Sequence, residues 1–470
     1  MRARLLIALC SLLVLAIPAA GGAAERMLIG FQDDPSFRWR DDCATVLDIA
    51  QQLDATIVRT TVYWSRIAAT RPVDATDPMD PAYKFDDLDE LARNAQSRGM
   101  EMMLTFWGTP SWANGGKGQN FAPTNFGDFR AFAQAVAKRY SGAYPGIPFV
   151  HYYTVWNESN LGQFLSPQYD SKGKPAAPFI YAKLYQAAYT GIKAGNRRAL
   201  IGLGETSARG RDKFLHAAGA QETESPGRFA QLLSTVRPRL KFDGYSQHPY
   251  PTELTQPPAQ KVRFPNVTLS QLPTFEKSLD KWFGRKNIPI WITEYGYQTR
   301  PQEPHGVTYT KQAAYARQAL NLARKDDRVQ MFIWFILRDD PTSTWQSGLL
   351  ARDGAKKPAF NVFSALDRLL DAHNAIFTVK PGITNPVIRV AALEIAARSG
   401  PGTLVGVSVR AYAKGKVAGS AQPQANVGVD GYVTVPVPIR TQAKTTYTVI
   451  CEIGDANGNT LTRSLAIVVP

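Results

Sequence analysis

The strongest constraint on the fold is a regular alternation, from residue 26 onward, between short apolar segments and segments with helical spacing. Eight apolar segments have the length and composition of buried strands: Met27–Phe31, Thr56–Val62, Glu101–Phe106, Phe149–Trp156, Ala199–Leu203, Phe242–Ser246, Ile288–Thr293 and Val329–Phe335. Helical segments follow them at Cys43–Leu53, Phe85–Arg98, Asn125–Tyr140, Phe179–Ala194, Arg228–Val236, Leu272–Phe283, Lys311–Lys325 and Pro358–Ala372. Eight such pairs predict a (β/α)₈ TIM barrel over residues 25–376.

A doubly wound open sheet is the competing α/β architecture for this alternation. That fold usually carries a glycine-rich phosphate-binding loop directly after its first strand. No such loop follows Met27–Phe31. The sequence therefore favours the closed barrel.

The pattern changes after about residue 376, where helical spacing gives way to short alternating strands. These strands are predicted at Val387–Leu393, Leu404–Tyr412, Tyr432–Val437, Tyr447–Ile453 and Leu461–Val469. The pattern predicts a small all-β sandwich of immunoglobulin-like type over residues 377–470. A brace against the barrel is favoured over a carbohydrate-binding module, because this part of the sequence has no array of tryptophans.

The first 24 residues have the layout of a secretory signal peptide. Arg2 and Arg4 precede an apolar stretch, Leu5–Ile17, and small residues follow at Ala19–Ala24. The apolar stretch is too short for a membrane span, so we expect a secreted, extracellular protein with no membrane span. Its two remaining cysteines, at positions 43 and 451, lie on apolar faces and are predicted to be buried thiols rather than a disulfide.

The formal net charge is +15, and removal of residues 1–24 with Arg2 and Arg4 leaves +13. The lysines and arginines are spread along the chain rather than gathered in a run. A solvated basic surface explains this distribution, and attraction to an anionic cell-envelope polymer is the alternative. No nucleic-acid-binding motif accompanies the charge, so nucleic acid is not expected as a partner.

Two of the predicted strands lead directly into a glutamate. The fourth strand ends in Trp156-Asn157-Glu158, and the seventh in Thr293-Glu294. Strands of a parallel barrel all end at the same rim, so the two carboxyl groups are expected to face one another there. Hydrolysis of a glycosidic bond requires a pair of carboxyl groups. One gives a proton to the leaving oxygen, and the other, as a carboxylate, meets the positive charge that develops at the sugar carbon.

With these motifs the chain resembles the retaining glycoside hydrolases of clan A over residues 26 to about 376. The motifs are most similar to those of families 39 and 5 and of bacterial exopolysaccharide endoglycosidases. The resemblance implies hydrolysis of a poly- or oligosaccharide by double displacement. It also implies that Glu158 is the general acid/base and Glu294 the nucleophile.

Further roles follow from the same resemblance. Asn157 occupies the position of an asparagine that contacts the sugar 2-hydroxyl, and Arg59 that of an arginine that supports the nucleophile. His248 and Tyr250 match substrate-contacting residues after strand six. Trp334 matches the aromatic floor beneath the sugar at the cleaved bond.

Other residues at strand ends are candidates for substrate contacts. Glu205, after strand five, is a third carboxyl group and is interpreted as a supporting or substrate contact. The candidate aromatic platforms for sugar rings are Trp107, Trp112, Tyr297, Tyr63, Trp64 and Trp345. No cluster with zinc-ligand spacing is present, so neither a metal nor another cofactor is expected.

Two other functions remain open from the sequence alone. The barrel could bind carbohydrate without cleaving it, although the presence of both glutamates argues against this. A transglycosylase would use the same residues, with a sugar acceptor in place of water. The sequence does not identify the sugar, the linkage, or whether cleavage is internal or terminal.

Overall fold

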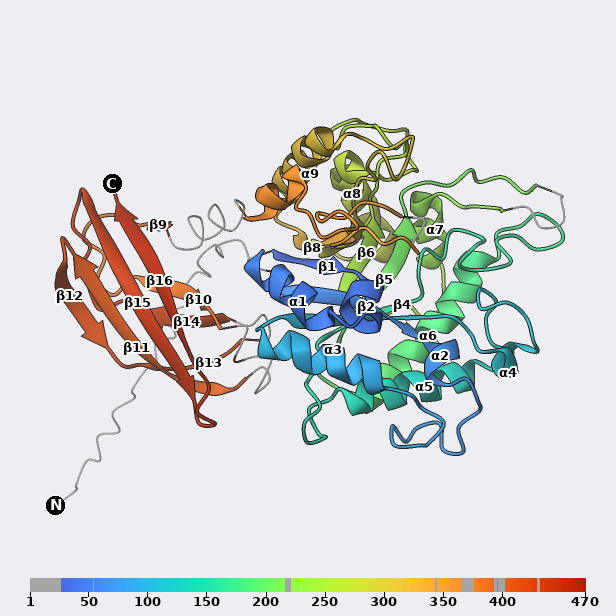
Figure 1. Cartoon of the computed structure of the whole chain (residues 1–470), viewed down its shortest axis with the longest axis horizontal. Helices are drawn as coiled ribbons and strands as arrows, with labels where there is room; N and C mark the ends of the chain where they lie inside the picture. The colour runs from blue at the N-terminus through green and yellow to red at the C-terminus, as the bar shows by residue number, and fades with distance from the viewer. Residues whose placement is uncertain are drawn as a thin grey trace, which may run out of the picture.

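The computed structural model describes residues 27–53, 55–215, 221–342, 345–364, 376–392, 395, 402–428 and 432–470. Its larger part is a closed barrel in which eight strands follow one another in chain order (Figure 1). All neighbouring strands are parallel, including the closing pair β1–β8. The strands are β1 (Leu28–Gln32), β2 (Ile57–Tyr63), β3 (Glu101–Trp107), β4 (Tyr152–Val155), β5 (Leu200–Ser207), β6 (Gly244–His248), β7 (Ile290–Tyr295) and β8 (Val329–Phe335). The predicted (β/α)₈ barrel is confirmed.

Helices surround the strands as expected. They are α1 (Cys43–Gln52), α2 (Trp64–Ile67), α3 (Asp86–Ser97), α4 (Ser111–Asn114), α5 (Phe126–Arg139), α6 (Ala177–Gly195), α7 (Pro226–Leu233), α8 (Leu272–Phe283) and α9 (Tyr309–Arg324), with short helices η1 (Pro35–Trp39) and η2 (Leu269–Gln271). Asn125 caps α5, because its side-chain oxygen accepts a hydrogen bond from the Gly127 N–H. The last predicted helix is present over 358–364, and its remainder lies outside the described residues.

Side chains of the barrel strands contribute to two distinct apolar layers, one inside the barrel and one between the strands and the helices. Seven residues fill its interior: Leu28, Ile57, Met103, Tyr152, Trp291, Met331 and Ile333. A larger cluster fills the space between the strands and the helices. Because side chains alternate along a strand, inward positions at the carboxyl ends of the strands face the mouth of the barrel. Arg59, two residues after Ile57 on β2, occupies such a position.

The ends of several strands differ from those that the sequence predicts. The predicted fourth strand, Phe149–Trp156, is shorter in the structure because 149 instead pairs with Ser141, and Trp156 has a left-handed backbone with φ 68°. Strands β5 and β6 continue four and two residues beyond their predicted ends. Their last residues are polar, and apolar periodicity does not detect polar residues that line the mouth.

A separate β-domain follows the barrel. Its strands are β9 (Ile376–Thr378), β10 (Val387–Ala391), β11 (Leu404–Ala413), β12 (Lys416–Ala421), β13 (Gln424–Asn426), β14 (Tyr432–Pro436), β15 (Thr445–Asp455) and β16 (Thr460–Val469). β10 and β14 form one sheet, and the other strands form a second sheet around β11, β15 and β16. Buried valines and isoleucines form its core, which confirms the predicted β-sandwich.

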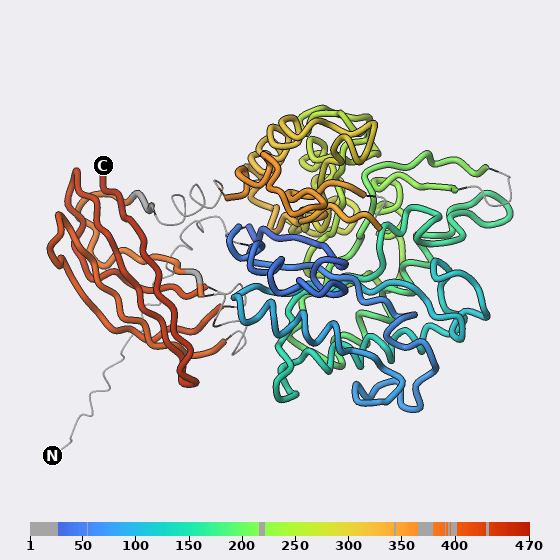
Figure 2. The backbone as a smooth tube through the Cα atoms, viewed as in Figure 1, coloured from blue at the N-terminus to red at the C-terminus, as the bar shows by residue number. Residues whose placement is uncertain are grey.

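The β-domain lies at one end of the molecule, whereas the long loops that follow β3 and β5 extend from the opposite side of the barrel (Figures 1 and 2). Cys43 in α1 and Cys451 in β15 are both free thiols, the former half-buried and the latter buried. Among the described residues, no helix combines the length and apolar character needed to cross a membrane. The predicted signal peptide, 1–24, lies outside the described residues.

Candidate active site

Arg59 is the centre of the charged cluster at the barrel mouth. Its side chain is fully buried, and its Nη1 donates to Glu294 Oε1 at 2.6 Å. Its Nη2 donates to Glu205 Oε2 at 2.6 Å and to Asn157 Oδ1 at 3.2 Å. Its Nε donates to Thr105 Oγ1 at 2.9 Å. One guanidinium therefore connects β2 with β3, β5, β7 and the end of β4, and it fixes two carboxylates in a shared orientation.

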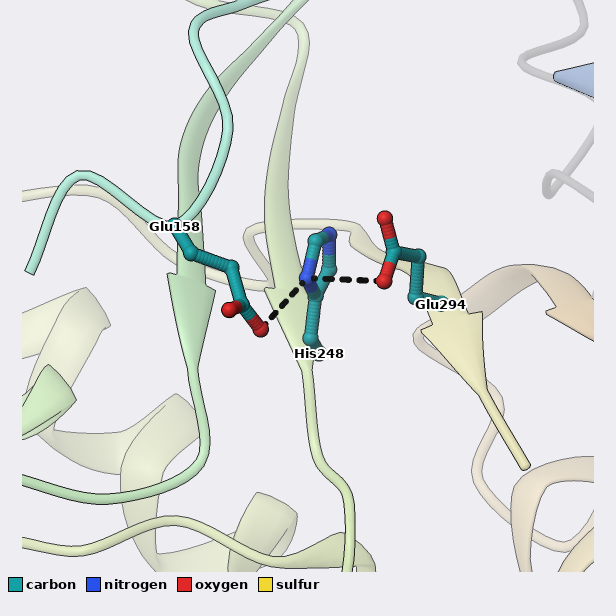
Figure 3. Close-up of side chains that lie close together, drawn as sticks. All are labelled: Glu158, His248 and Glu294. Atoms are coloured by element: carbon teal, nitrogen blue, oxygen red, sulfur yellow. Dashed lines mark hydrogen bonds and ion pairs between the residues drawn. The ribbon is translucent and has the colours of Figure 1, made fainter. Parts of the chain in front are cut away.

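His248, at the end of β6, bridges the carboxyl groups (Figure 3). Its Nδ1 lies 3.1 Å from Glu158 Oε1 and 3.6 Å from Glu294 Oε2, and its Nε2 lies 3.1 Å from Glu205 Oε2. Burial alone lowers the pKa of His248, but the Glu294 charge and hydrogen bonds with Glu158 and Glu205 raise that pKa to about 10. A doubly protonated imidazolium can donate from both nitrogens, which is compatible with these contacts.

Glu205 is the fully buried carboxylate of the cluster. Burial raises its pKa, but the Arg59 charge and the hydrogen bond with His248 outweigh burial and lower that pKa to about 2. Glu205 is therefore ionised across the range in which proteins work. Because it stays ionised and inaccessible, its geometry suits it to hold Arg59 and His248 in place rather than to donate a proton to a substrate.

Irregular backbone re-aims the acidic side chains. The β5–β6 register shifts between Gly204 and Thr206, and Glu205 within this bulge has φ 50°. The β7–β8 register shifts between Ile292 and Tyr295, which brackets Glu294. Bulges of this kind redirect a side chain at the rim of a barrel.

The backbone is also unusual where β4 ends. Glu158 has φ 38°, in the left-handed region that non-glycine residues rarely adopt. Such conformations persist where the surrounding contacts over-determine them, as the His248 hydrogen bond does at Glu158. The rim of the barrel therefore holds its carboxyl groups in positions that a regular strand would not give them.

Glu158 and Glu294 are the accessible pair. Their side chains are 13% and 10% exposed, whereas those of Arg59, Glu205 and His248 are 0% exposed. One oxygen of each, together with a ring nitrogen of His248, lies within 4.8 Å of the others. Tyr250 adds a hydroxyl that donates to Glu294 Oε2 at 3.2 Å. The structure thus brings the two predicted carboxyl groups together at the mouth.

The same three side chains, Glu158, His248 and Glu294, are spaced closely enough to ligate a cation. Their present contacts give them another role. His248 is held as a cation by the carboxylates around it, and an imidazolium has no lone pair for a metal. Arg59 already supplies positive charge to Glu294. These three side chains and Arg59 therefore already satisfy one another's charges and hydrogen bonds.

Aromatic rings lie on both sides of the carboxyl pair. Trp107, at the end of β3, is half-buried and contacts Tyr63 and Phe164 edge-on, with ring centroids 5.9 and 6.0 Å apart. Near Glu294, the Tyr250 ring lies 5.2 Å from that of Trp345. These positions suit sugar platforms, and direct contact of Trp107, Tyr250 or Trp345 with substrate stays a prediction.

Two of the predicted platforms are wrong. Trp334 is fully buried on the helix side of β8, where its Nε1 donates to the Ser347 carbonyl and its ring packs against Phe363. Tyr297 is 1% exposed, and its hydroxyl donates to the Gln256 carbonyl. Both residues belong to the apolar core between strands and helices, so neither can contact a sugar.

Two further platform candidates pack elsewhere. Trp64 is fully buried in the core. Trp112 is half-buried, but it packs edge-on against Trp64 and donates its Nε1 hydrogen to the Ala68 carbonyl at 2.8 Å. These contacts tie Trp112 to α2 and the core rather than to the carboxyl pair.

Sequence reasoning missed two residues of this site. Gln32, the last residue of β1, accepts a hydrogen bond from Arg59 Nη1, and the polar end Gln32-Asp33-Asp34 of that strand could have indicated it. Phe335 is the inward aromatic of β8, two residues after the interior residue Ile333, and its ring lies 6.2 Å from that of Trp345. Strand parity alone would have favoured Phe335 over its neighbour.

The buried imidazolium predicts a pH-dependent stability. The pKa of His248 is raised from 6.5 to about 10, so its contribution to folding is fully present below pH 6.5 and is lost as the pH rises through 10. We expect the Tm of the wild type to fall from pH 7 to 10 more steeply than that of His248→Gln, as measured by differential scanning calorimetry. The exposed His305→Gln variant is the control and should follow the wild type. Parallel curves for wild type and His248→Gln would contradict the assignment.

The fold has relatives of low sequence identity among solved structures. A family 39 glycoside hydrolase from the gut symbiont Bacteroides cellulosilyticus WH2 is 18% identical with a TM-score of 0.54, and the match covers 89% of this chain and 80% of that one. A glucosidase from Croceicoccus marinus is 14% identical, with a TM-score of 0.53 and coverage of 89% and 94%. A GH5_18 protein from Streptomyces cattleya in complex with GlcNAc is 15% identical, with a TM-score of 0.54 and coverage of 80% and 88%.

These structural matches support the shared fold. Comparison with curated protein sequences gives no significant match. The family model "Cellulase (glycosyl hydrolase family 5)", in contrast, matches residues 28–338, which span the barrel from β1 to just beyond β8. This match, together with the carboxyl pair at the rim, identifies an enzyme rather than a non-catalytic binding protein. The chain belongs to the cellulase family, glycosyl hydrolase family 5, and is a glycoside hydrolase of clan A.

Proposed function

We propose that this glycoside hydrolase cleaves with retention, with Glu294 as the nucleophile and Glu158 as the general acid/base. The observation that carries the proposal is the separation of their carboxyl groups, whose nearest oxygens lie within 4.8 Å. Retaining enzymes place the two carboxyl groups about 5–5.5 Å apart. Inverting enzymes keep them about 6.5–9.5 Å apart, because a water molecule must fit between the carboxylate that acts as the base and the sugar. The spacing supports direct attack by a carboxylate.

In the first step, Glu294 attacks the anomeric carbon, while Glu158 gives its proton to the leaving oxygen as the glycosidic bond breaks. In the second, Glu158 takes a proton from water, whose oxygen displaces Glu294 from the sugar. Arg59 and Tyr250 direct hydrogen bonds at the two oxygens of Glu294, which supports its role as the ionised partner. The two steps together conserve the proton and return both carboxyl groups to their starting states.

The neighbours of the pair have complementary roles in this scheme. Asn157 is oriented by the Arg59 Nη2 hydrogen bond and is half-buried at the rim, which suits a contact to the sugar 2-hydroxyl. His248 contacts both Glu158 and Glu294, so it transmits a change of charge on one to the other. Its full burial makes it a positioning residue for the two carboxyl groups.

The substrate in this proposal is a poly- or oligosaccharide, and the enzyme acts outside the cell. The arginine-led apolar segment at the N-terminus supports export. The net charge of +13 that remains after removal of residues 1–24 supports attraction to an anionic polymer of the cell envelope. Expression of the full chain should release a protein that lacks residues 1–24, which N-terminal sequencing would detect. An N-terminus at Met1 in the extracellular fraction would contradict cleavage of this segment.

The anomeric configuration of the first product tests the proposal. A panel of aryl glycosides and polysaccharides should first yield a substrate that the wild type turns over. Proton NMR during early turnover should then show the product with the configuration of the substrate, before mutarotation. The opposite anomer would mean inversion, and the assignment of Glu294 as nucleophile would fall. Added acceptor sugars in the same assay would detect transfer in place of hydrolysis.

A further inference from the structure

A run of aromatic rings extends from Trp107, at the end of β3, through Tyr63 to Trp39 in η1. Trp156, next to Asn157 and Glu158, donates its Nε1 hydrogen to the Phe164 carbonyl at 2.6 Å, and Trp107 donates to the same oxygen at 3.3 Å. From Trp107 the run passes to Tyr63. The Tyr63 ring then lies 6.1 Å from that of Trp39, the last residue of η1.

The outer end of this run lies above the carboxyl cluster. Tyr63 and Trp107 are register partners at the carboxyl ends of β2 and β3. Tyr63 follows Arg59 by four residues on the same inward face of β2, a rise of about 13 Å at roughly 3.3 Å per residue. If a sugar chain is bound at Glu158 and Glu294, the sugar that lies beside Tyr63 is therefore not one of the two sugars joined by the cleaved bond.

Trp39 is an exposed yet fixed ring. Its relative exposure is 42%, which makes it one of the few large apolar side chains on the surface. Its Nε1 donates to Asp87 Oδ2 at 3.1 Å, and that same oxygen pairs with Arg38 at 2.8 Å. The edge of the indole is therefore held in place, although the ring itself remains accessible to solvent.

Arg66, in the short helix α2, lies against this outer end. Its guanidinium carbon is 4.7 Å from the Trp39 ring centroid and 4.8 Å from that of Tyr63. The side chain is exposed, and no described residue forms a hydrogen bond or an ion pair with it. The two nearby arginines differ, because Arg38 pairs with Asp87 and Arg40 pairs with Asp340.

An arginine stacked on aromatic faces keeps its N–H donors free at the edge of the guanidinium plane. That edge matches a carboxylate or a sulfate with two parallel hydrogen bonds, and prior stacking reduces the side-chain freedom lost on binding. Neutral sugars need only the aromatic platform. A planar cation without a counter-ion at the outer end of a sugar platform therefore selects for an anionic group.

We propose that Arg66, together with Trp39 and Tyr63, forms a subsite that binds an anionic substituent on a sugar remote from the cleaved bond. The substrate class that follows is an acidic polysaccharide, carrying either a carboxylate or a sulfate ester. This inference rests on the proposed function, since it assumes that the sugar chain passes through the carboxyl pair. It assigns Arg66 to substrate selection and gives it no part in the chemical step.

Matched polymers with a common backbone test this subsite. Electrophoretic retardation of the full chain would be compared in gels containing carboxymethyl cellulose, cellulose sulfate or neutral hydroxyethyl cellulose. We expect the wild type to be retarded more by an anionic polymer than by the neutral one. Arg66→Gln should raise the apparent Kd for the anionic polymers about tenfold, because a charge-assisted hydrogen bond is lost. The apparent Kd for the neutral polymer should not change. The difference between the carboxymethyl and sulfate arms identifies the preferred anion.

Arg93→Gln is the matched control, because Arg93 is an exposed arginine on α3 and, unlike Arg66, is not stacked on a ring of the aromatic run. It should bind the anionic polymers as the wild type does, which separates a local subsite from a general effect of net charge. Equal losses in the two variants would overturn the proposal, as would a wild type that the anionic polymers retard no more than the neutral one. Turnover of an aryl glycoside by Arg66→Gln should equal that of the wild type. If the wild type itself turned over no glycoside, that result would instead count against the proposed catalytic function.

Discussion

Replacement of Glu294 by alanine is expected to lower kcat by about 10⁴-fold or more, because no other group can form the covalent intermediate. The pair of hydrogen bonds from Arg59 and Tyr250 would then point at an empty space. Initial rates with a dinitrophenyl glycoside measure the loss. Glu90→Ala, on the exposed face of α3, is the control and should retain wild-type kcat.

Azide distinguishes a lost nucleophile from a misfolded protein. In Glu294→Ala a small anion can occupy the vacated space and attack the sugar directly. The product should then be a glycosyl azide of inverted configuration, formed at a rate that rises with azide concentration. A glycosyl azide of retained configuration from this variant would mean that the roles of the two glutamates are reversed. Full activity without azide would place the nucleophile elsewhere.

Replacement of Glu158 by alanine is expected to depend on the leaving group. General acid catalysis contributes about 10²–10⁴-fold, so natural sugar leaving groups should lose that factor. A dinitrophenolate leaves without protonation, so the first step should stay close to the wild-type rate. The second step should become slow because no base activates water, and a burst of dinitrophenolate should precede a low steady state.

Azide again reports the role of the missing group in the Glu158 variant. It requires no base, so it should accelerate the second step and yield a glycosyl azide of retained configuration. Glu205→Gln provides a contrast, because Glu205 is held by Arg59 and His248 and has no exposed surface. Azide should not rescue that variant. Absence of a burst in Glu158→Ala, with equal losses for good and poor leaving groups, would contradict the acid/base assignment.

The catalytic pair could be predicted from sequence because its signal is local. Glu158 and Glu294 each follow an apolar strand, and parallel strands bring their carboxyl ends to one rim. The roles of Arg59 and His248 depend on that same rule, and both lie where the strand order puts them. The eight barrel strands were equally readable, since each of them is an apolar segment of strand length.

Side-chain direction near the rim was harder to predict. The resemblance implied that Trp334 is the aromatic floor, yet strand parity sends Trp334 to the helix side and Phe335 to the mouth. Bulges have the reverse effect: they turn toward the mouth side chains that parity alone would place on the helix side. Glu205 and Glu294 reach the cluster through register shifts in β5 and β7, and no apolar pattern records these shifts.

Contacts that depend on tertiary packing were not readable. Gln32 and Arg59 lie 27 residues apart and meet only when β1 and β2 pair. Arg66 looked like one of many dispersed basic residues until η1 placed Trp39 against it. In the β-domain, β12 escaped detection because most of its residues are exposed and few are apolar. Sequence periodicity reports burial, so exposed strands and polar networks leave little trace in it.

The central claim is that Glu294 becomes covalently bonded to the sugar, with Glu158 as the base that releases it. Mass spectrometry of intact Glu158→Gln protein during turnover of a dinitrophenyl glycoside tests this most directly. The account predicts that the protein gains the mass of one sugar and that peptide mapping places the sugar on Glu294. An unmodified protein during a demonstrated burst, or a sugar attached to any other residue, would contradict it.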